Sequence, residues 1–176
     1  MGELIVVTGP PGAGKSSVSS QLADMVEPSA VVAGDEFFGF LKRGYIPPWL
    51  PESDQQNTVV IEAAAAAAGW LSRHCWVVYD GVVGPWFLPT FARRTGLKQI
   101  HYVTLLPPLE TCLERVRTRT DHGFTDLAAA RHMYLQFADA EIDGRHVLTD
   151  PDDDASALAA RIYGDITAGS FGYPTG

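Results

Sequence analysis

Leu4-Ile5-Val6-Val7-Thr8 runs directly into Gly9-Pro10-Pro11-Gly12-Ala13-Gly14-Lys15-Ser16 near the start of the chain. The first five residues form a continuous apolar and β-branched run, which is typical of a strand buried on both faces of a parallel sheet. The next eight match the phosphate-binding loop, a glycine-rich turn that ends in Lys and Ser and opens a helix. A strand, such a turn and a helix in this order predict an α/β fold with a phosphate-binding loop.

The loop contains the residue types that nucleotide binding requires. Gly9, Gly12 and Gly14 allow backbone N–H groups to approach phosphate oxygens at the positive end of the following helix. Lys15 would place a positive charge on the β and γ phosphates, and Ser16 would supply a hydroxyl ligand to Mg²⁺. The alternative is an ordinary glycine-rich turn. We predict that ATP and Mg²⁺ bind here, and that the nucleotide contacts Gly9, Pro10, Pro11, Gly12, Ala13, Gly14, Lys15, Ser16 and Ser17.

Length and charge restrict the classes of protein and partner. The chain has 176 residues, 46% of them hydrophobic, and a formal net charge of −8, which suits one domain with a real core. Proteins that bind nucleic acid usually present a basic face, so an acidic chain argues against a nucleic acid polymer as partner. The apolar stretches are shorter than the roughly 18 residues of a membrane span. We expect a cytoplasmic protein, monomer or homodimer, with no membrane partner and no basic, apolar leader.

Strand and helix patterns alternate along the rest of the chain. Strands are expected over 30–33, 76–79, 99–105 and 145–148, and helices over 15–25, 36–42, 52–74, 88–95, 109–117, 126–138 and 152–168. This alternation predicts a five-stranded parallel sheet flanked by helices, with ligands at the carboxyl ends of the strands. Asp126 is expected to cap one helix, and the acidic residues around Pro151 the last one. One domain is expected over 1–168, with an insert at about 36–58, a lid at about 118–126 and a loose tail at 169–176.

Two aspartates follow predicted strands at the edge where the phosphate loop lies. Asp80 ends an apolar run, as in the second nucleotide motif, where an acidic group holds the metal or its water. Asp35 follows the strand at 30–33 and would face the γ phosphate from the acceptor side. A carboxylate there could orient a hydroxyl and take its proton. The alternatives are a turn former for Asp80 and a helix cap for Asp35, while Glu36 could share or exchange the role of base.

Four motifs in the same order resemble the P-loop kinases that phosphorylate small hydroxyl compounds. They are Gly9 to Ser16, Gly34-Asp35, Asp80-Gly81, and Arg115 with Arg119. The resemblance extends over most of the chain to gluconate kinase, shikimate kinase, chloramphenicol phosphotransferase and the zeta-toxin-like AAA-type kinases, although only the first motif is specific by itself. It implies a P-loop NTPase fold, nucleoside-kinase-like, with a lid.

The resemblance also implies roles for single residues. Asp35 would contact the acceptor and act as general base, Arg115 would lie along the adenine, and Arg119 would hold the transferring phosphate. The spacing of the two arginines predicts that they share one face of their helix, with Arg117 pointing away. A solvated helix end, whose positive charges complement the helix dipole, is the alternative for these arginines.

The acceptor site is expected in the insert and in the loop after Asp80. Aromatic faces with a few polar groups suit a ring or a sugar, although some of these residues would belong to the core. The sequence has no distinctive signature of gluconate, shikimate or chloramphenicol recognition, so the acceptor stays open. The residues predicted to bind it are Asp35, Phe38, Lys42, Arg43, Trp49 and Trp86.

These features favour an ATP-dependent phosphotransferase with Lys15, Asp35 and Arg119 as catalytic residues. Its acceptor would be a hydroxyl of a small metabolite, sugar-like or antibiotic-like molecule. A nucleoside or nucleotide kinase would use the same loop and lid and stays open. A nucleotide-dependent switch is the alternative from another class. A switch normally carries a water-positioning Gln or Glu after its metal-binding strand, and Gly81-Val82-Val83 provides none.

Overall fold

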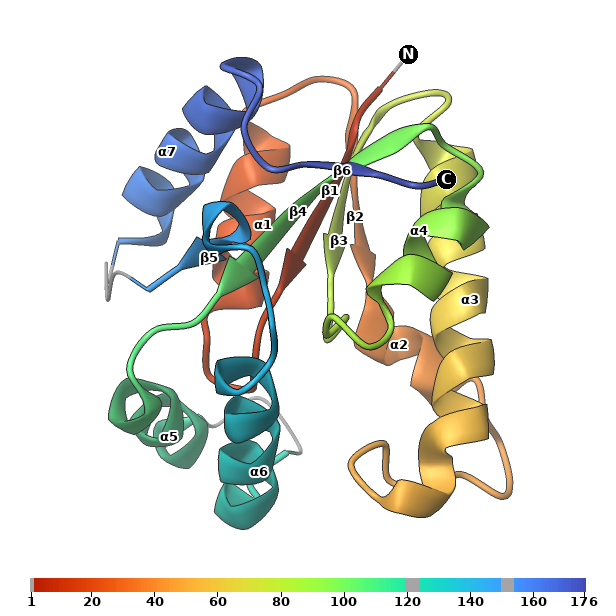
Figure 1. The fold of residues 1–176 in the computed structure, drawn as a ribbon, viewed down its shortest axis with the longest axis vertical. Coiled ribbons are helices and arrows are strands. Elements are labelled where there is room, and N and C mark those ends of the chain that lie inside the picture. Colours follow the sequence, from red (N-terminus) through yellow and green to blue (C-terminus); the bar gives the residue numbers. More distant parts are fainter. Residues whose placement is uncertain (1, 120–123, 150–153) are drawn as a thin grey trace.

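A parallel sheet with the strand order β2-β3-β1-β4-β5 forms the centre of the structure (Figure 1). The computed structural model describes residues 2–119, 124–149 and 154–176. Each neighbouring pair in this order is parallel, which confirms the predicted five-stranded parallel sheet. Its strands are β1 (Leu4–Thr8), β2 (Ser29–Ala33), β3 (Trp76–Asp80), β4 (Gln99–Leu105) and β5 (Val147–Leu148).

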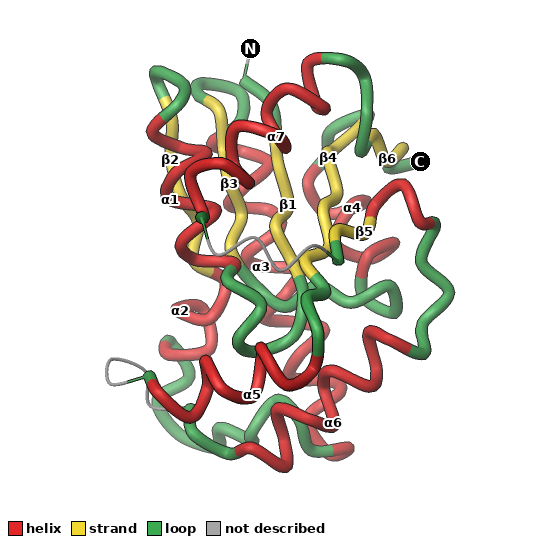
Figure 2. Tube along the Cα trace, turned by 90° about the vertical axis from the view of Figure 1, so that its left-hand side faces the viewer, coloured by secondary structure: helices red, strands yellow, loops and turns green. Residues whose placement is uncertain are grey.

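Helices cover both faces of the sheet and gather beyond its carboxyl edge (Figures 1 and 2). One face packs against α1 (Lys15–Asp24) and α7 (Ala155–Thr167), and the other against α3 (Asp54–Leu71) and α4 (Leu88–Thr95). Three helices lie beyond the carboxyl ends of the strands, namely α2 (Gly34–Gly39), α5 (Leu109–Thr118) and α6 (Leu127–Ala138). Single 3₁₀ turns, η1 (Pro51–Ser53) and η2 (Gly144–His146), precede α3 and β5. None of the helices in the described part of the chain is long and apolar enough to cross a bilayer.

Residues of β1 alternate between two hydrophobic cores. Leu4 and Val6 pack with the residues of α3 and α4, whereas Ile5 and Val7 pack with those of α1 and α7. Successive side chains of a strand point to opposite faces, so a strand covered on both faces favours apolar side chains, and the polar Thr8 at its end is paired with the Val83 N–H. This explains the unbroken apolar sequence that predicts β1.

The end of the chain differs from the expected loose tail. Strand β6 (Gly172–Pro174) pairs antiparallel with β4 over Gln99–His101. β5 pairs only with the last two residues of β4, which leaves the first part of that edge with unpaired backbone groups. β6 supplies partners for them, and Phe171, 3% exposed, anchors the turn before it. The tail is therefore held against the sheet in two ways. Its backbone pairs with the otherwise unpaired edge of β4, and the ring of Phe171 is buried.

Two predicted helix caps are present in the structure. Asp126 accepts a hydrogen bond from the Ala129 N–H at 2.9 Å at the start of α6, as the sequence predicts. Asp154 accepts one from the Ser156 N–H at 2.9 Å at the start of α7. The other acidic residues of that predicted cap, within 150–153, lie outside the described residues.

Helix α3 and helix α4 approach each other at Gly69. A Cβ added to Gly69 would lie 2.1 Å from the carbonyl oxygen of Thr95, a backbone atom that cannot move independently of α4. Gly164 of α7, by contrast, has open space around its Cα. Helix packing therefore requires glycine at position 69, whereas position 164 has room for a side chain.

Alanine substitutions at these two positions should change stability in opposite directions. Gly69→Ala forces α3 and α4 apart and is expected to destabilise the protein by about 1–3 kcal/mol. Gly164→Ala gains helix propensity without a clash and is expected to stabilise it by about 0.5–1 kcal/mol. Urea unfolding of both variants measures the difference, and a stabilising Gly69→Ala would contradict the close approach.

Candidate functional site

The phosphate loop is held by its own backbone between β4 and α5. Gly9 and Gly12 have φ values of 142° and 82°, in the left-handed region that side chains disfavour. A Cβ at Gly9 would lie 2.2 Å from the Leu105 carbonyl oxygen, and one at Gly12 would lie 2.1 Å from that of Cys112. Glycine is therefore required at both positions, and the loop cannot shift without moving β4 or α5.

Strand register brings the two predicted aspartates to the phosphate loop. Asp80, at the end of β3, is paired with Val7 of β1 on one side and with Ala33 of β2 on the other. Gly9 lies two residues beyond Val7, and Asp35 lies two residues beyond Ala33. The parallel sheet therefore places Asp80 between the start of the loop and Asp35.

The amine of Lys15 lies within electrostatic reach of both carboxylates. Its Nζ donates a hydrogen bond to the Pro10 carbonyl oxygen at 3.0 Å. Burial lowers the pKa of Lys15, and the negative charges of Asp35 and Asp80 act in the opposite direction and raise it. The positive charge of Arg119 also lowers it. One cation from the loop, two carboxylates and a second cation therefore share this region.

Asp35 does not cap α2, contrary to the alternative that the sequence leaves open. Helix α2 begins at Gly34, its N-cap residue is Ala33, and no side chain caps it. Asp35 is exposed in the first turn of the helix. Its charge also contributes, after burial, to the raised pKa of the underlying Tyr79. The carboxylate is therefore available to a bound molecule.

Helix α5 packs on the outer side of the loop and carries the predicted arginines. Arg115 Nη1 donates a long hydrogen bond of 3.5 Å to the Gly12 carbonyl oxygen, while Arg117 forms an ion pair with Glu114. Helix α5 ends at Thr118, and Arg119 is its C-cap residue, with an extended backbone. The charges of Arg115 and Arg119 both act on the thiol of Cys112. Chain direction changes at Arg119, and its guanidinium still lies within electrostatic reach of Lys15.

Cys112 is a buried residue behind the loop. Its side chain is 1% exposed, and burial raises the pKa of its thiol to about 11, even though Arg115, Lys15 and Arg119 lower it. A thiol with such a pKa is protonated near neutral pH and is a poor nucleophile. Cys112 therefore contributes packing to the site.

The predicted acceptor residues lie in three environments. Phe38 is half-buried on α2, and Lys42 and Arg43 are exposed in the loop that follows. Trp49 is half-buried, and its ring centroid lies 5.1 Å from that of Phe124 in an edge-to-face contact. Trp86 packs on Phe137 of α6 at 5.3 Å and is 43% exposed. Of the predicted lid, residues 120–123 lie outside the described residues, and Phe124 is the first one after them.

A buried polar contact that the sequence gives no sign of fixes the loop after Asp80. Thr8 Oγ1 accepts a hydrogen bond from the Val83 N–H at 2.8 Å, and the Tyr102 hydroxyl donates one to the Val83 carbonyl oxygen, also at 2.8 Å. Both backbone groups of Val83 are thereby paired with side chains of β1 and β4. Residues 8 and 83 are far apart in sequence, so no local pattern could reveal this contact.

The donor set at the loop fits ATP and Mg²⁺. The loop joins β1 to the N-terminus of α1, which carries positive partial charge, and Lys15 adds a full charge. Among the described residues, no group of three or more His, Cys, Asp and Glu side chains could hold a metal. Mg²⁺ typically takes only one or two protein ligands and completes its shell with phosphates and water. Ser16 and Asp80 carry oxygen atoms of the kind that Mg²⁺ takes as ligands.

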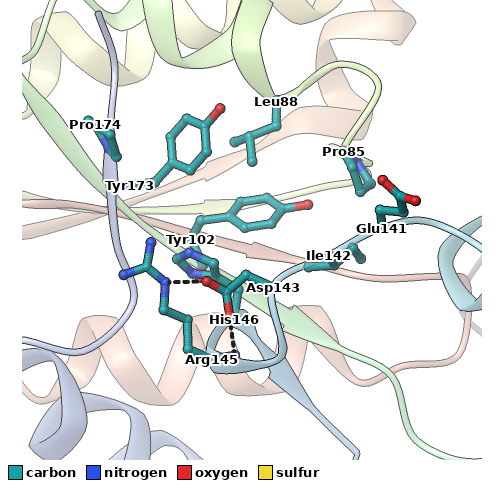
Figure 3. Close-up of a pocket in the computed structure, with 10 residues that line it drawn as sticks. All are labelled: Pro85, Leu88, Tyr102, Glu141, Ile142, Asp143, Arg145, His146, Tyr173 and Pro174. Atoms are coloured by element: carbon teal, nitrogen blue, oxygen red, sulfur yellow. Dashed lines mark hydrogen bonds and ion pairs between the residues drawn. The ribbon is translucent and has the colours of Figure 1, made fainter.

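A separate cavity of about 360 Å³ lies on the α3/α4 face, against β4 (Figure 3). The ring of Tyr102 lies 5.8 Å from that of His146 and 6.3 Å from that of Tyr173. Arg145 pairs with Asp143 at 3.0 Å at its margin. No residue predicted for the nucleotide or the acceptor lines this cavity. Its lining is Pro85, Leu88, Tyr102, Glu141, Ile142, Asp143, Arg145, His146, Tyr173 and Pro174.

Solved structures share this fold over nearly their whole length. The Deinococcus radiodurans tunicamycin resistance protein has a TM-score of 0.69 at 18% identity, over 94% of this chain and 96% of that one. Shikimate kinase from Acinetobacter baumannii, solved with shikimate, has a TM-score of 0.64 at 18% identity, over 96% and 95%. A gluconokinase from Sinorhizobium meliloti 1021 has a TM-score of 0.63 at 21% identity, over 96% and 97%.

These similarities confirm the predicted resemblance to P-loop small-molecule kinases at the level of fold. No curated protein sequence matches the chain significantly. The family model described as an AAA domain matches residues 5–146, which is most of the chain. The chain therefore belongs to this AAA domain family.

Proposed function

We propose that this protein is an ATP-dependent phosphotransferase that moves the γ-phosphate to a hydroxyl of a small molecule. The observation that carries the proposal is the convergence of Lys15, Asp80 and Asp35 at one edge of the sheet. Phosphoryl transfer between two oxygens depends mainly on positioning and on neutralisation of charge. The phosphate loop with Lys15 and the carboxylate of Asp80 would neutralise charge, and the exposed carboxylate of Asp35 would position the acceptor.

The phosphate loop and its neighbours would form the nucleotide half of the site. ATP with Mg²⁺ would supply the phosphoryl group to be transferred. Lys15 would move its hydrogen bond from the Pro10 carbonyl to the phosphates, and burial strengthens the interaction of its charge with them. Ser16 and Asp80 would hold the metal. Arg115, already against Gly12, would flank the adenine, and Arg119 would hold the transferring phosphate.

Asp35 would form the centre of the acceptor half. Its carboxylate makes no capping bond, so it could accept a hydrogen bond from the acceptor hydroxyl and take its proton as the new bond to phosphorus forms. Aromatic and basic side chains around it would bind the rest of the acceptor. These are Phe38, Lys42, Arg43, Trp49 and Trp86.

Transfer of labelled γ-phosphate to a panel of hydroxyl compounds tests the proposal. The panel includes shikimate, gluconate, adenosine 5′-phosphosulfate, nucleosides and tunicamycin, because proteins of the same fold are named for several of these compounds. Labelled product with one class, and slow ATP hydrolysis without any acceptor, is the expected result. Rapid ATP hydrolysis with no transfer of label to any compound would contradict the proposal and favour a nucleotide-dependent switch.

Lys15→Ala should abolish phosphoryl transfer, because it removes the cation on the β and γ phosphates. We expect the turnover number to fall by about 10²-fold or more. Calorimetric titration with ATP and the transfer assay measure the effect. Lys98→Ala changes an exposed lysine next to β4 and is the matched control. Near wild-type transfer in Lys15→Ala would exclude the loop as the phosphate site.

Asp35→Asn should separate catalysis from nucleotide binding. The amide keeps the shape of the carboxylate but cannot take a proton, so turnover should fall by about 10²-fold or more while ATP affinity stays the same. Asp24→Asn, at the exposed end of α1, is the control. If Glu36→Gln lowers turnover more than Asp35→Asn does, the role of base belongs to Glu36.

A further inference from the structure

A proline-rich segment before α3, residues 44–51, has few hydrogen-bond donors of its own. We call it the proline insert. Pro47, Pro48 and Pro51 lack a backbone N–H group, so the segment has more carbonyl oxygens than it can pair internally. Leu50 N–H donates to the Pro47 carbonyl at 3.0 Å. Donors for the remaining carbonyl groups come from other segments or from solvent.

Side chains at the start of α3 supply those donors. Gln56 makes a two-point contact with Ile46, whose N–H donates to Gln56 Oε1 at 2.8 Å and whose carbonyl accepts from Nε2 at 2.7 Å. Asn57 Nδ2 donates to the Pro48 carbonyl at 2.7 Å. The Ser53 hydroxyl lies 2.6 Å from the Leu50 carbonyl and 2.9 Å from that of Pro48. Alternate carbonyls of the insert are therefore bound to one rigid helix end.

These hydrogen bonds hold the residues on both sides of Trp49 in the sequence. The residues before and after it, Pro48 and Leu50, both have their carbonyl oxygens bound by side chains of η1 or α3. The ring of Trp49 then packs edge-to-face on Phe124, at 5.1 Å between centroids. The bound carbonyls on either side of Trp49 hold its backbone beside Phe124.

The other end of the insert lies within electrostatic reach of Asp35. Burial raises the pKa of the Tyr45 hydroxyl, and the negative charge of Asp35 raises it further. Tyr45 directly precedes Ile46, the residue that Gln56 binds through both backbone groups. The insert therefore extends from the neighbourhood of the candidate base to the aromatic pair of Trp49 and Phe124.

The anchor also includes a polar group whose burial costs stability. Asn57 is 7% exposed, and within the described part of the chain its Oδ1 has no hydrogen-bond partner. An apolar residue at this position would avoid the unpaired oxygen, but it would remove the Asn57 donor from the Pro48 carbonyl and leave that carbonyl to the Ser53 hydroxyl. Local costs of this kind are typical of functional sites.

We infer that Ser53, Gln56 and Asn57 are positioning residues that hold the proline insert so that Trp49 forms a wall of the acceptor site. The inference rests on the proposed function. Side chains on a helix hold a binding group more accurately than a free loop does. Gln56 is the central member, because its amide is both donor and acceptor to one residue, which neither Ala nor Glu can reproduce.

Fluorine NMR of the protein labelled with 5-fluorotryptophan tests this positioning directly. The four tryptophans give four signals, each assigned by its loss in a Trp→Phe variant. Gln56→Ala should shift or broaden the signal of Trp49 and leave those of Trp70, Trp76 and Trp86 unchanged. Gln55→Ala changes an exposed neighbour in the same helical turn and should move none of them.

The outcomes separate positioning from general stability. An unchanged Trp49 signal in Gln56→Ala overturns the inference, and so does movement of all four signals. If Gln56→Ala does not fold, Gln56→Glu decides, because it keeps the acceptor for the Ile46 N–H and loses only the donor. It should move the Trp49 signal in the same way.

Binding and kinetics separate this inference from the proposed function. ATP affinity of Gln56→Ala should stay within about twofold of wild type, because the lost hydrogen bonds lie on the acceptor side. The panel compound that accepts label should have a KM about tenfold higher in Gln56→Ala than in Gln55→Ala. A wild-type protein that fails to bind ATP would contradict the proposed function and leave the fluorine result valid.

Discussion

Close packing of the phosphate loop backbone controls the arrangement of the whole site. Carbonyl oxygens of β4 and α5 lie where a Cβ of Gly9 or Gly12 would have to be. Because no atom can enter this space, the loop, the strand and the helix have one mutual arrangement. Lys15 and Arg115 take their positions from it, one at the end of the loop and one on the helix against it. Asp80 and Asp35 reach the same edge through the strand register.

The two halves of the site are built by different means. Main-chain contacts and glycines form the phosphate loop, the proposed nucleotide half, and leave little room for substitution at Gly9 and Gly12. Side-chain amides of Gln56 and Asn57 bind the carbonyls of a proline-rich segment that would belong to the proposed acceptor half. Changes in the proline insert would therefore alter the proposed acceptor wall without moving the phosphate loop. A division of this kind suits a fold whose members act on different compounds.

Much of the fold could be predicted, because its signals are local. The apolar run of β1, the helix expected over 88–95 and the cap at Asp126 each occupy one short stretch, and the structure has all three. The sequence predicts a loose tail, whereas the structure has β6 there. This strand could not be predicted, because it forms on an unpaired edge of β4 that only the folded sheet creates. The helix expected over 109–117 ends at Thr118 in the structure, so this boundary could also be predicted.

In the candidate site, too, some features follow from local sequence and others only from the tertiary structure. By itself, the sequence determined the phosphate loop, the parallel sheet and the residues at its carboxyl edge, because glycine spacing and apolar runs are properties of neighbouring residues. Only the tertiary structure decided that Thr8 and Tyr102 hold Val83, that Gln56 holds Ile46, and that Trp49 meets Phe124. These contacts join residues with no shared local pattern, and they exist only once β1, β3 and β4 have paired and α3 has packed beside them.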